Sequence, residues 1–328
     1  MTHIGRGRLL TLALVAMLAA LSVLSLISGR VWTPLDQLGG AQDPRWLIVT
    51  ELRIPRTLLA IAVGAALGLS GAALQGYTRN PLADPGVLGV SSMAALGAVL
   101  TLFLNIGAAS SWVLPAFAMA GAAIGVAMLI AVAAPSGEAI SFLLAGVILN
   151  AIAGAGVALA LTLSPNPWAT SEITTWLLGS LTDRSIIDVR IAAPPILVGA
   201  AVLLATGRGL DALTLGEIGA RALGVSLRRI QVMIGAGIGL ACGASVAVTG
   251  VISFVGLIVP HLVRRCVGGP PSGHLLPSAV GGAVLLLAAD VLVRLIPGAN
   301  EVHVSVVTAA LGGPFFLALL ISMRRRLA

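Results

Sequence analysis

Long apolar runs separated by short polar stretches dominate the chain. Leu9–Ile27, Leu58–Leu74 and Val87–Leu104 are three such runs. A helix of about 18 or more apolar residues is long enough to cross the roughly 30 Å hydrocarbon core of a bilayer. The pattern predicts ten membrane spans at residues 9–29, 55–77, 86–104, 112–134, 139–162, 188–206, 229–249, 251–267, 275–295 and 303–323.

Composition agrees with an all-α, polytopic membrane helical bundle that forms one transmembrane domain over residues 1–328. Hydrophobic residues make up 58% of the chain and charged residues 9%, whereas a soluble domain carries roughly 25% charged residues. So few charges cannot build a water-facing surface. We interpret the first apolar run as a retained helix and not a signal peptide, because Ser28–Arg30 follows it in place of an A-x-A cleavage site.

All 19 basic residues are arginine, and the net charge is +7. With the N-terminus inside, twelve arginines fall in cytoplasmic segments and seven in outer segments. Because basic residues concentrate in cytoplasmic loops, both termini are predicted to be cytoplasmic. Nucleic-acid binding is disfavoured, since there is no solvated basic domain.

The chain contains no lysine and therefore no P-loop, which needs a Lys to reach nucleotide phosphates. If transport is driven by ATP, the ATPase, with its ATP and magnesium, must be another polypeptide. Cys242 and Cys266 form no paired motif and are predicted to be buried free thiols. We expect no metal site and no cofactor bound by this chain.

Outer segments carry more arginine than expected, notably Arg53 and Arg56 around Pro55. Interfacial snorkelling and docking of an acidic partner are both open interpretations. Asp290 and Arg294 are spaced for a helical ion pair, although Arg294 could instead join the other two arginines in one outer cluster.

Two polar segments are predicted on the cytoplasmic side. The first is a turn in which Asp84 caps the next helix, formed by Asn80, Pro81, Asp84 and Pro85. The second, at about residues 211–226, is too short and too charged to span; apolar residues recur in it at helical spacing between Gly216 and Gly224. It predicts a short amphipathic helix that lies either in the membrane interface or against a cytoplasmic partner.

Glycine is abundant, and two patterns place small residues on helix faces: Gly64 with Gly68, and Gly235–Gly239. Small residues let helix backbones approach closely in lipid, so these patterns predict a tightly packed bundle. In the stretch Gly250–His261, glycine and proline interrupt the regularity of a span, which is tolerated where neighbours satisfy the backbone.

Several motifs together resemble the permease subunits of type II ABC importers, the family that takes up iron–siderophores, heme and vitamin B12. The resemblance covers about Leu52 to Leu320 and rests on these segments: Leu52–Arg56, Gln75–Gly89, Trp176–Leu181, Leu215–Gly224, Gly256–His261, Ala289–Asp290 and Val307–Phe316. It departs from the family at Glu301–Ser305, where His303 and Ser305 replace the usual Pro and Gly.

The resemblance implies a homodimer with two cytoplasmic ATPase subunits and an extracytoplasmic substrate-binding protein. It assigns docking of that binding protein to Arg53, Arg56 and Arg294. It assigns ATPase coupling to Leu215, Gly216, Glu217, Ala220, Arg221, Leu223 and Gly224, and a cytoplasmic gate or pathway to Ala139, Ile140, Ser141 and Asn150.

The predicted function is that of a permease in the bacterial cytoplasmic membrane that imports an iron–siderophore complex by alternating access. Heme or cobalamin import by the same architecture is the alternative. A secondary transporter without an ATPase is the alternative from another class, although its coupling charges would be expected near the middle of the spans. A membrane enzyme is disfavoured, because no His, Asp and Glu cluster stands out.

Overall fold

The computed structural model describes residues 3–29, 32, 43–107, 110–133, 138–296 and 302–327, and every regular element in these ranges is helical. In chain order the elements are α1 (His3–Ile27), α2 (Pro44–Leu47), η2 (Ile48–Arg53), α3 (Ile54–Thr78), η3 (Pro85–Leu88), α4 (Val90–Phe103), α5 (Val113–Ala133), α6 (Ala139–Thr162), α7 (Pro167–Leu177), α8 (Ile186–Ala205), α9 (Gly207–Leu213), α10 (Gly216–Ala222), α11 (Leu227–Thr249), α12 (Val255–Val267), α13 (Ser272–Leu295) and α14 (Val304–Leu327). The predicted all-α bundle is confirmed.

Seven helical stretches in the described residues are long and apolar enough to cross a membrane: Gly7–Ile27, Arg45–Thr78, Val113–Ala133, Ala139–Thr162, Ile186–Ala205, Leu227–Thr249 and Ser272–Leu295. Val90–Phe103 and Val304–Leu319 are shorter apolar helices. All ten predicted spans therefore coincide with helices, but not all of these helices are full spans.

Two of the predicted spans are wrong in extent. The predicted span 86–104 is interrupted at Gly89, whose φ of 75° separates η3 from α4. The predicted span 251–267 starts as non-helical backbone, and only the 13 residues of α12 are helical. At 1.5 Å per residue α12 is about 20 Å long, too short to cross the hydrocarbon core by itself.

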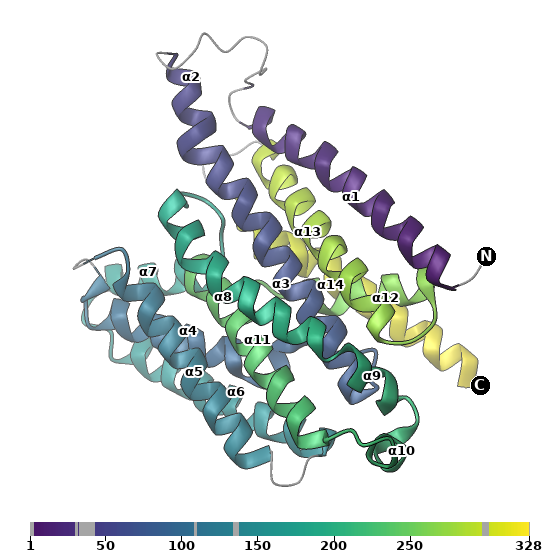
Figure 1. Ribbon diagram of the computed structural model, residues 1–328. Coiled ribbons are helices and arrows are strands. Elements are labelled where there is room, and N and C mark those ends of the chain that lie inside the picture. Colours follow the sequence, from purple (N-terminus) through teal and green to yellow (C-terminus); the bar gives the residue numbers. More distant parts are fainter. Residues whose placement is uncertain are drawn as a thin grey trace.

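The bundle is built around α3, α11 and α13, whose apolar windows are mostly buried, whereas α1 is almost entirely at the periphery. Figure 1 shows α3 crossing the middle of the molecule, with α1, α12 and α13 on one side of it and α4, α5 and α6 on the other. The predicted span 55–77 corresponds to α3, which has Pro55 at its second position, and α2 and η2 extend the same helical stretch back to Arg45.

Small residues bring α3 and α13 into backbone contact, as the glycine pattern predicts. A Cβ atom on Gly68 would collide with the carbonyl oxygen of Ser278, and one on Gly64 with that of Gly282. The same close approach joins α8 to α11, where a Cβ on Gly199 would lie 2.7 Å from the carbonyl oxygen of Gly237. The central helices therefore pack as one tight unit.

The turn predicted to be cytoplasmic enters the bundle. Asn150, eleven residues or about 16 Å along α6 from its start, donates hydrogen bonds to the carbonyl oxygens of Gly86 and Val87, at 3.0 and 3.1 Å. The Asp84 side chain accepts from the Gly86 N–H at 2.8 Å, which confirms the predicted cap. Non-helical backbone at this depth is tolerated because protein groups satisfy it.

Candidate functional site

The predicted coupling segment, residues 211–226, begins at the end of α9 and contains all of α10, and both short helices lie between α8 and α11. Gly216 has a φ of 85° and Gly224 a φ of 78°, a region that only glycine enters easily. These two residues bound α10 as the sequence predicts. Figure 1 places α10 beyond the lower end of α11, at the end of the molecule opposite α2.

α10 presents an apolar surface on its outer side. Ile218 is 87% exposed, Leu215 67% and Leu223 63%, whereas Ala220 is fully buried. Arg221 is exposed beside them, and Glu217 is half-buried. A short helix anchored by one buried alanine, with large apolar side chains outward, suits the groove of a partner protein.

The three predicted docking arginines lie together at the opposite end of the bundle, around Asp290. The Arg56 Nε donates to Asp290 Oδ1 at 2.8 Å, and the Arg294 Nε donates to Asp290 Oδ2 at 2.9 Å. The Asp290 side chain is completely buried. The predicted ion pair of Asp290 with Arg294 is therefore present, and Arg56 shares the same carboxylate.

This arginine cluster also ties α1 to α3 and α13. Arg294 donates to the Ser25 carbonyl oxygen at 2.9 Å, and Arg53 donates to the Leu26 carbonyl oxygen at 2.8 Å. Ser25 and Thr57 share a further hydrogen bond of 2.7 Å. All three arginines are less than a tenth exposed. They are held by contacts inside the subunit, and their role in docking stays a prediction.

The predicted gate residues do not form one site. Ala139, Ile140 and Ser141 make up the first turn of α6, where Ile140 is mostly exposed. Asn150 lies about three turns further along, where Ser92 donates to its amide oxygen and its own amide nitrogen binds η3. Asn150 therefore fixes the turn at Asp84–Gly89, which we call the re-entrant turn, to α6. The pathway role of the four residues stays a prediction.

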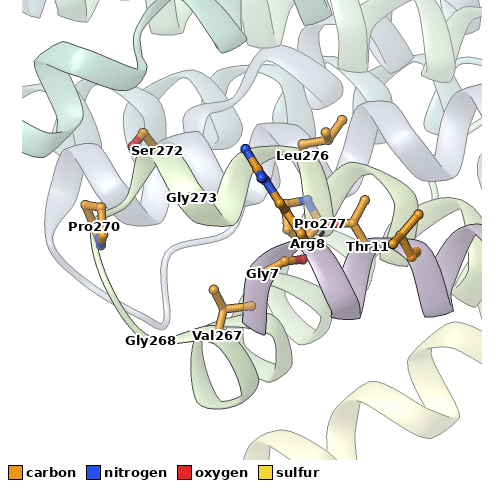
Figure 2. Close-up of a pocket in the computed structure, with 11 residues that line it drawn as sticks. Gly7, Arg8, Thr11, Val267, Gly268, Pro270, Ser272, Gly273, Leu276 and Pro277 are labelled. Atoms are coloured by element: carbon orange, nitrogen blue, oxygen red, sulfur yellow. Dashed lines mark hydrogen bonds between the residues drawn. The ribbon is translucent and has the colours of Figure 1, made fainter. Parts of the chain in front are cut away.

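A mostly apolar groove of about 660 Å³ lies where the start of α1 meets the turn between α12 and α13. Figure 2 shows Arg8 and Thr11 of α1 on one side of it and Ser272 and Gly273 of α13 on the other. None of the predicted site residues lines this groove. Because Ser272 is hydrogen-bonded to Asp211 of α9, the groove marks the start of α1 as lying at the same end of the bundle as α9 and α10.

Cysteine and histidine form no metal centre among the described residues, where no three metal-ligating side chains come together. Cys242 is buried as predicted, but Cys266 is exposed, since it lies in the last turn of α12 and faces away from the bundle. The departure at Ser305 leaves α14 intact: this helix begins at Val304, and the Ser305 hydroxyl donates to the Leu178 carbonyl oxygen. Glu301 lies outside the described residues.

The sequence did not single out two residues that connect elements, Asp211 and Ser25. Asp211 binds Ser272, which is 61 positions away, and Ser25 binds Arg294, which is 269 positions away. No local spacing relates residues so distant in the chain. The available signal for Asp211 is that it is one of two acidic residues, with Glu217, in residues 211–226.

Comparison with known proteins agrees with this architecture. The model of the FecCD transport family matches residues 12–322. The chain is 39% identical over 293 residues to YvrB, an uncharacterised ABC transporter permease protein of Bacillus subtilis, with 87% of this chain and 82% of YvrB covered. It is 36% identical over 313 residues to the hemin transport system permease HmuU of Yersinia pestis, with 94% and 92% covered.

A second transport substrate is represented among the relatives. The vitamin B12 import system permease BtuC of Salmonella typhimurium is 38% identical over 321 residues, covering 97% of this chain and 95% of BtuC. A solved inward-facing structure assigned to the metal-chelate type of ABC transporters matches with a TM-score of 0.87 and 30% identity, over 95% of this chain and 98% of that one. This chain therefore belongs to the FecCD transport family of ABC transporter permeases.

Proposed function

We propose that the chain is the transmembrane subunit of an ATP-driven importer that carries an iron–siderophore complex, heme or cobalamin across the bacterial cytoplasmic membrane. The observation that carries the proposal is the apolar surface of α10, where Leu215, Ile218 and Leu223 are exposed at the end of the bundle. The distribution of arginine predicts that this end is cytoplasmic. A chain without lysine has no P-loop of its own, so a surface for a separate ATPase is the feature that ATP-driven transport requires.

The mechanism is alternating access, without bond chemistry in this chain. ATP-driven closure of two ATPase subunits would displace α10 of each copy, and the spans would re-angle around a pathway between two copies of the chain. The exposed apolar face of α6 is consistent with an interface to a second copy of the chain. The exposed residues along it are Ile140, Leu144, Ile148 and Ile152. An extracytoplasmic binding protein would deliver the cargo to the end that holds the arginine cluster.

The cargo class follows from the relatives and not from a ligand site. The matched permeases of Yersinia pestis and Salmonella typhimurium carry hemin and vitamin B12 respectively, so these two classes stand beside a siderophore complex. All three are large and chelate a transition metal. Uptake into proteoliposomes of a ferric siderophore, hemin and cobalamin, each supplied with its binding protein, separates them.

The role of α10 is tested with the ATPase subunit co-expressed. We expect Ile218→Glu to abolish co-purification of the ATPase, because a carboxylate would have to be desolvated in an apolar interface. Trp168→Glu is the matched control, since Trp168 is 84% exposed on α7 at the other end of the bundle. Undiminished co-purification of Ile218→Glu would contradict the proposed surface. A chain that transports its cargo without any ATPase would instead support a secondary transporter.

A further inference from the structure

One acidic side chain links the coupling segment to α13. Asp211 of α9 accepts two hydrogen bonds from Ser272, the first residue of α13: from its N–H at 2.8 Å and from its hydroxyl at 2.6 Å. Hydrogen bonds to a charged carboxylate are roughly twice as strong as neutral ones. We refer to this pair as the Asp211–Ser272 clasp.

Asp211 also closes the turn between α9 and α10. Its carbonyl oxygen accepts from the Thr214 N–H at 3.1 Å and from the Thr214 hydroxyl at 2.7 Å. Leu210 and Leu213, on either side of Asp211, are buried beneath the turn. Through this one residue, the backbone that leads into α10 is fixed to the start of α13.

α13 extends from the clasp to the arginine cluster. Its 24 residues give it a length of about 36 Å. Asp290 lies near its far end and binds Arg56 of α3, while Arg294 binds Ser25 of α1. Along its length α13 packs on α3 by direct backbone contact at Gly64 and Gly68. α13 carries Pro277 five residues after Ser272, and beyond that point its close packing on α3 lets it transmit strain toward Asp290.

We propose that Asp211 is a positioning residue that transmits displacement of the coupling segment to α13, and through α13 to the arginine cluster at the outer end. The proposal rests on the proposed function, since it assumes that an ATPase moves α10. The clasp provides a polar link from the turn that leads into α10 to a closely packed helix that reaches the face where cargo enters. In this proposal Asp211 acts through Ser272 and not on the cargo.

A control pair of nearly identical chemistry exists in the same chain. Asp188 accepts hydrogen bonds from the N–H and the hydroxyl of Ser185, at 2.8 and 2.9 Å, in a capping box of α8. This pair lies within one helix terminus and joins no separate elements. Asp188→Ala therefore removes the same kind of bonds as Asp211→Ala without breaking a link between elements.

The test measures cargo taken up per ATP hydrolysed in proteoliposomes that contain the complete complex. Allosteric coupling between sites is typically worth 5- to 150-fold, so we expect Asp211→Ala to lower this ratio by about tenfold while ATP hydrolysis continues. Asp211→Asn, which keeps an acceptor for the Ser272 N–H, should recover much of the ratio, and Asp188→Ala should leave it unchanged. Adding Ser272→Ala to Asp211→Ala should cause no further loss.

The proposal is overturned by an unchanged ratio in Asp211→Ala, or by an equal fall in Asp188→Ala, which would mean that only stability matters. A second readout uses spin labels at exposed Leu292 of α13 and Trp168 of α7, with exposed Cys266 replaced by Ser. ATP should change their separation in the otherwise unmodified protein but not in Asp211→Ala. If the unmodified complex shows neither uptake nor cargo-stimulated ATP hydrolysis, the proposed function itself fails.

Discussion

Single residues carry out several tasks in this chain that their types alone would not reveal. Arginines in outer segments resemble free docking groups in the sequence, yet Arg56 and Arg294 share the buried carboxylate of Asp290. Taking charges out of water is costly, and only close partners offset that cost. The positions of these arginines at this end of the bundle therefore have a structural cause, whether or not a partner also docks there.

Replacing Asp290 should strongly destabilise the subunit. Asp290→Asn keeps the side-chain shape but removes the charge that two buried guanidinium groups share, and breaking a buried ion pair typically costs about 3–5 kcal/mol. Asp43→Asn is the control, because Asp43 pairs with the partly exposed Arg45 at 2.8 Å and exposed ion pairs contribute little to stability. Thermal unfolding in detergent checks both; equal shifts would contradict the account of the cluster.

At the scale of elements, the sequence was informative wherever apolar length decides the structure and misleading where the chain breaks inside the bundle. Spans such as α6 and α11 begin and end within a few residues of their prediction. The re-entrant turn at Asp84–Gly89 was missed because asparagine, proline and glycine mark a turn without marking its depth. Only the contacts of Asn150 with Gly86 and Val87 place this turn inside the bundle.

The same limit applies to the candidate sites. Local spacing predicted α10 from its bounding glycines, and it predicted the Asp290–Arg294 pair within α13. Each of these two features is confined to a few neighbouring residues of the chain. The Asp211–Ser272 clasp and the contact of Arg56 with Asp290 join residues far apart in the chain. Such pairs depend on how the helices pack against one another, and the local pattern of a single sequence does not identify which residues then meet.

Helix packing at the centre of the bundle should depend on glycine at specific positions. Gly68→Ala would drive a methyl group into the Ser278 carbonyl of α13, and overpacking of this kind typically costs about 1–3 kcal/mol. Gly154→Ala on α6 meets open space and should be neutral or gain up to about 1 kcal/mol from helix propensity. Melting temperatures that fall equally for the two variants would contradict direct contact between α3 and α13.

At the scale of the whole molecule, the two ends of the bundle are chemically different. The start of α1, the end of α12, the start of α13 and the coupling helices lie at one end, as the groove and the clasp show. The arginine cluster and α7 lie at the other. The arginine bias predicts that the first end is cytoplasmic, which would place the apolar face of α10 where an ATPase can reach it.

Labelling with a membrane-impermeant maleimide tests this orientation, because the chain carries one exposed cysteine at an end of the bundle and one buried cysteine inside it. Cys266 is exposed in the last turn of α12 at the predicted cytoplasmic end, and Cys242 is buried in α11. We expect Cys266 to react in inside-out vesicles and not in intact spheroplasts, and Cys242 to react in neither. A Trp168→Cys variant, with Cys266 replaced by Ser, should show the opposite pattern, since Trp168 is exposed on α7. Reaction of Cys266 from the outside would invert the topology and would place α10 out of reach of any cytoplasmic ATPase, so that the proposed surface for that subunit could not stand.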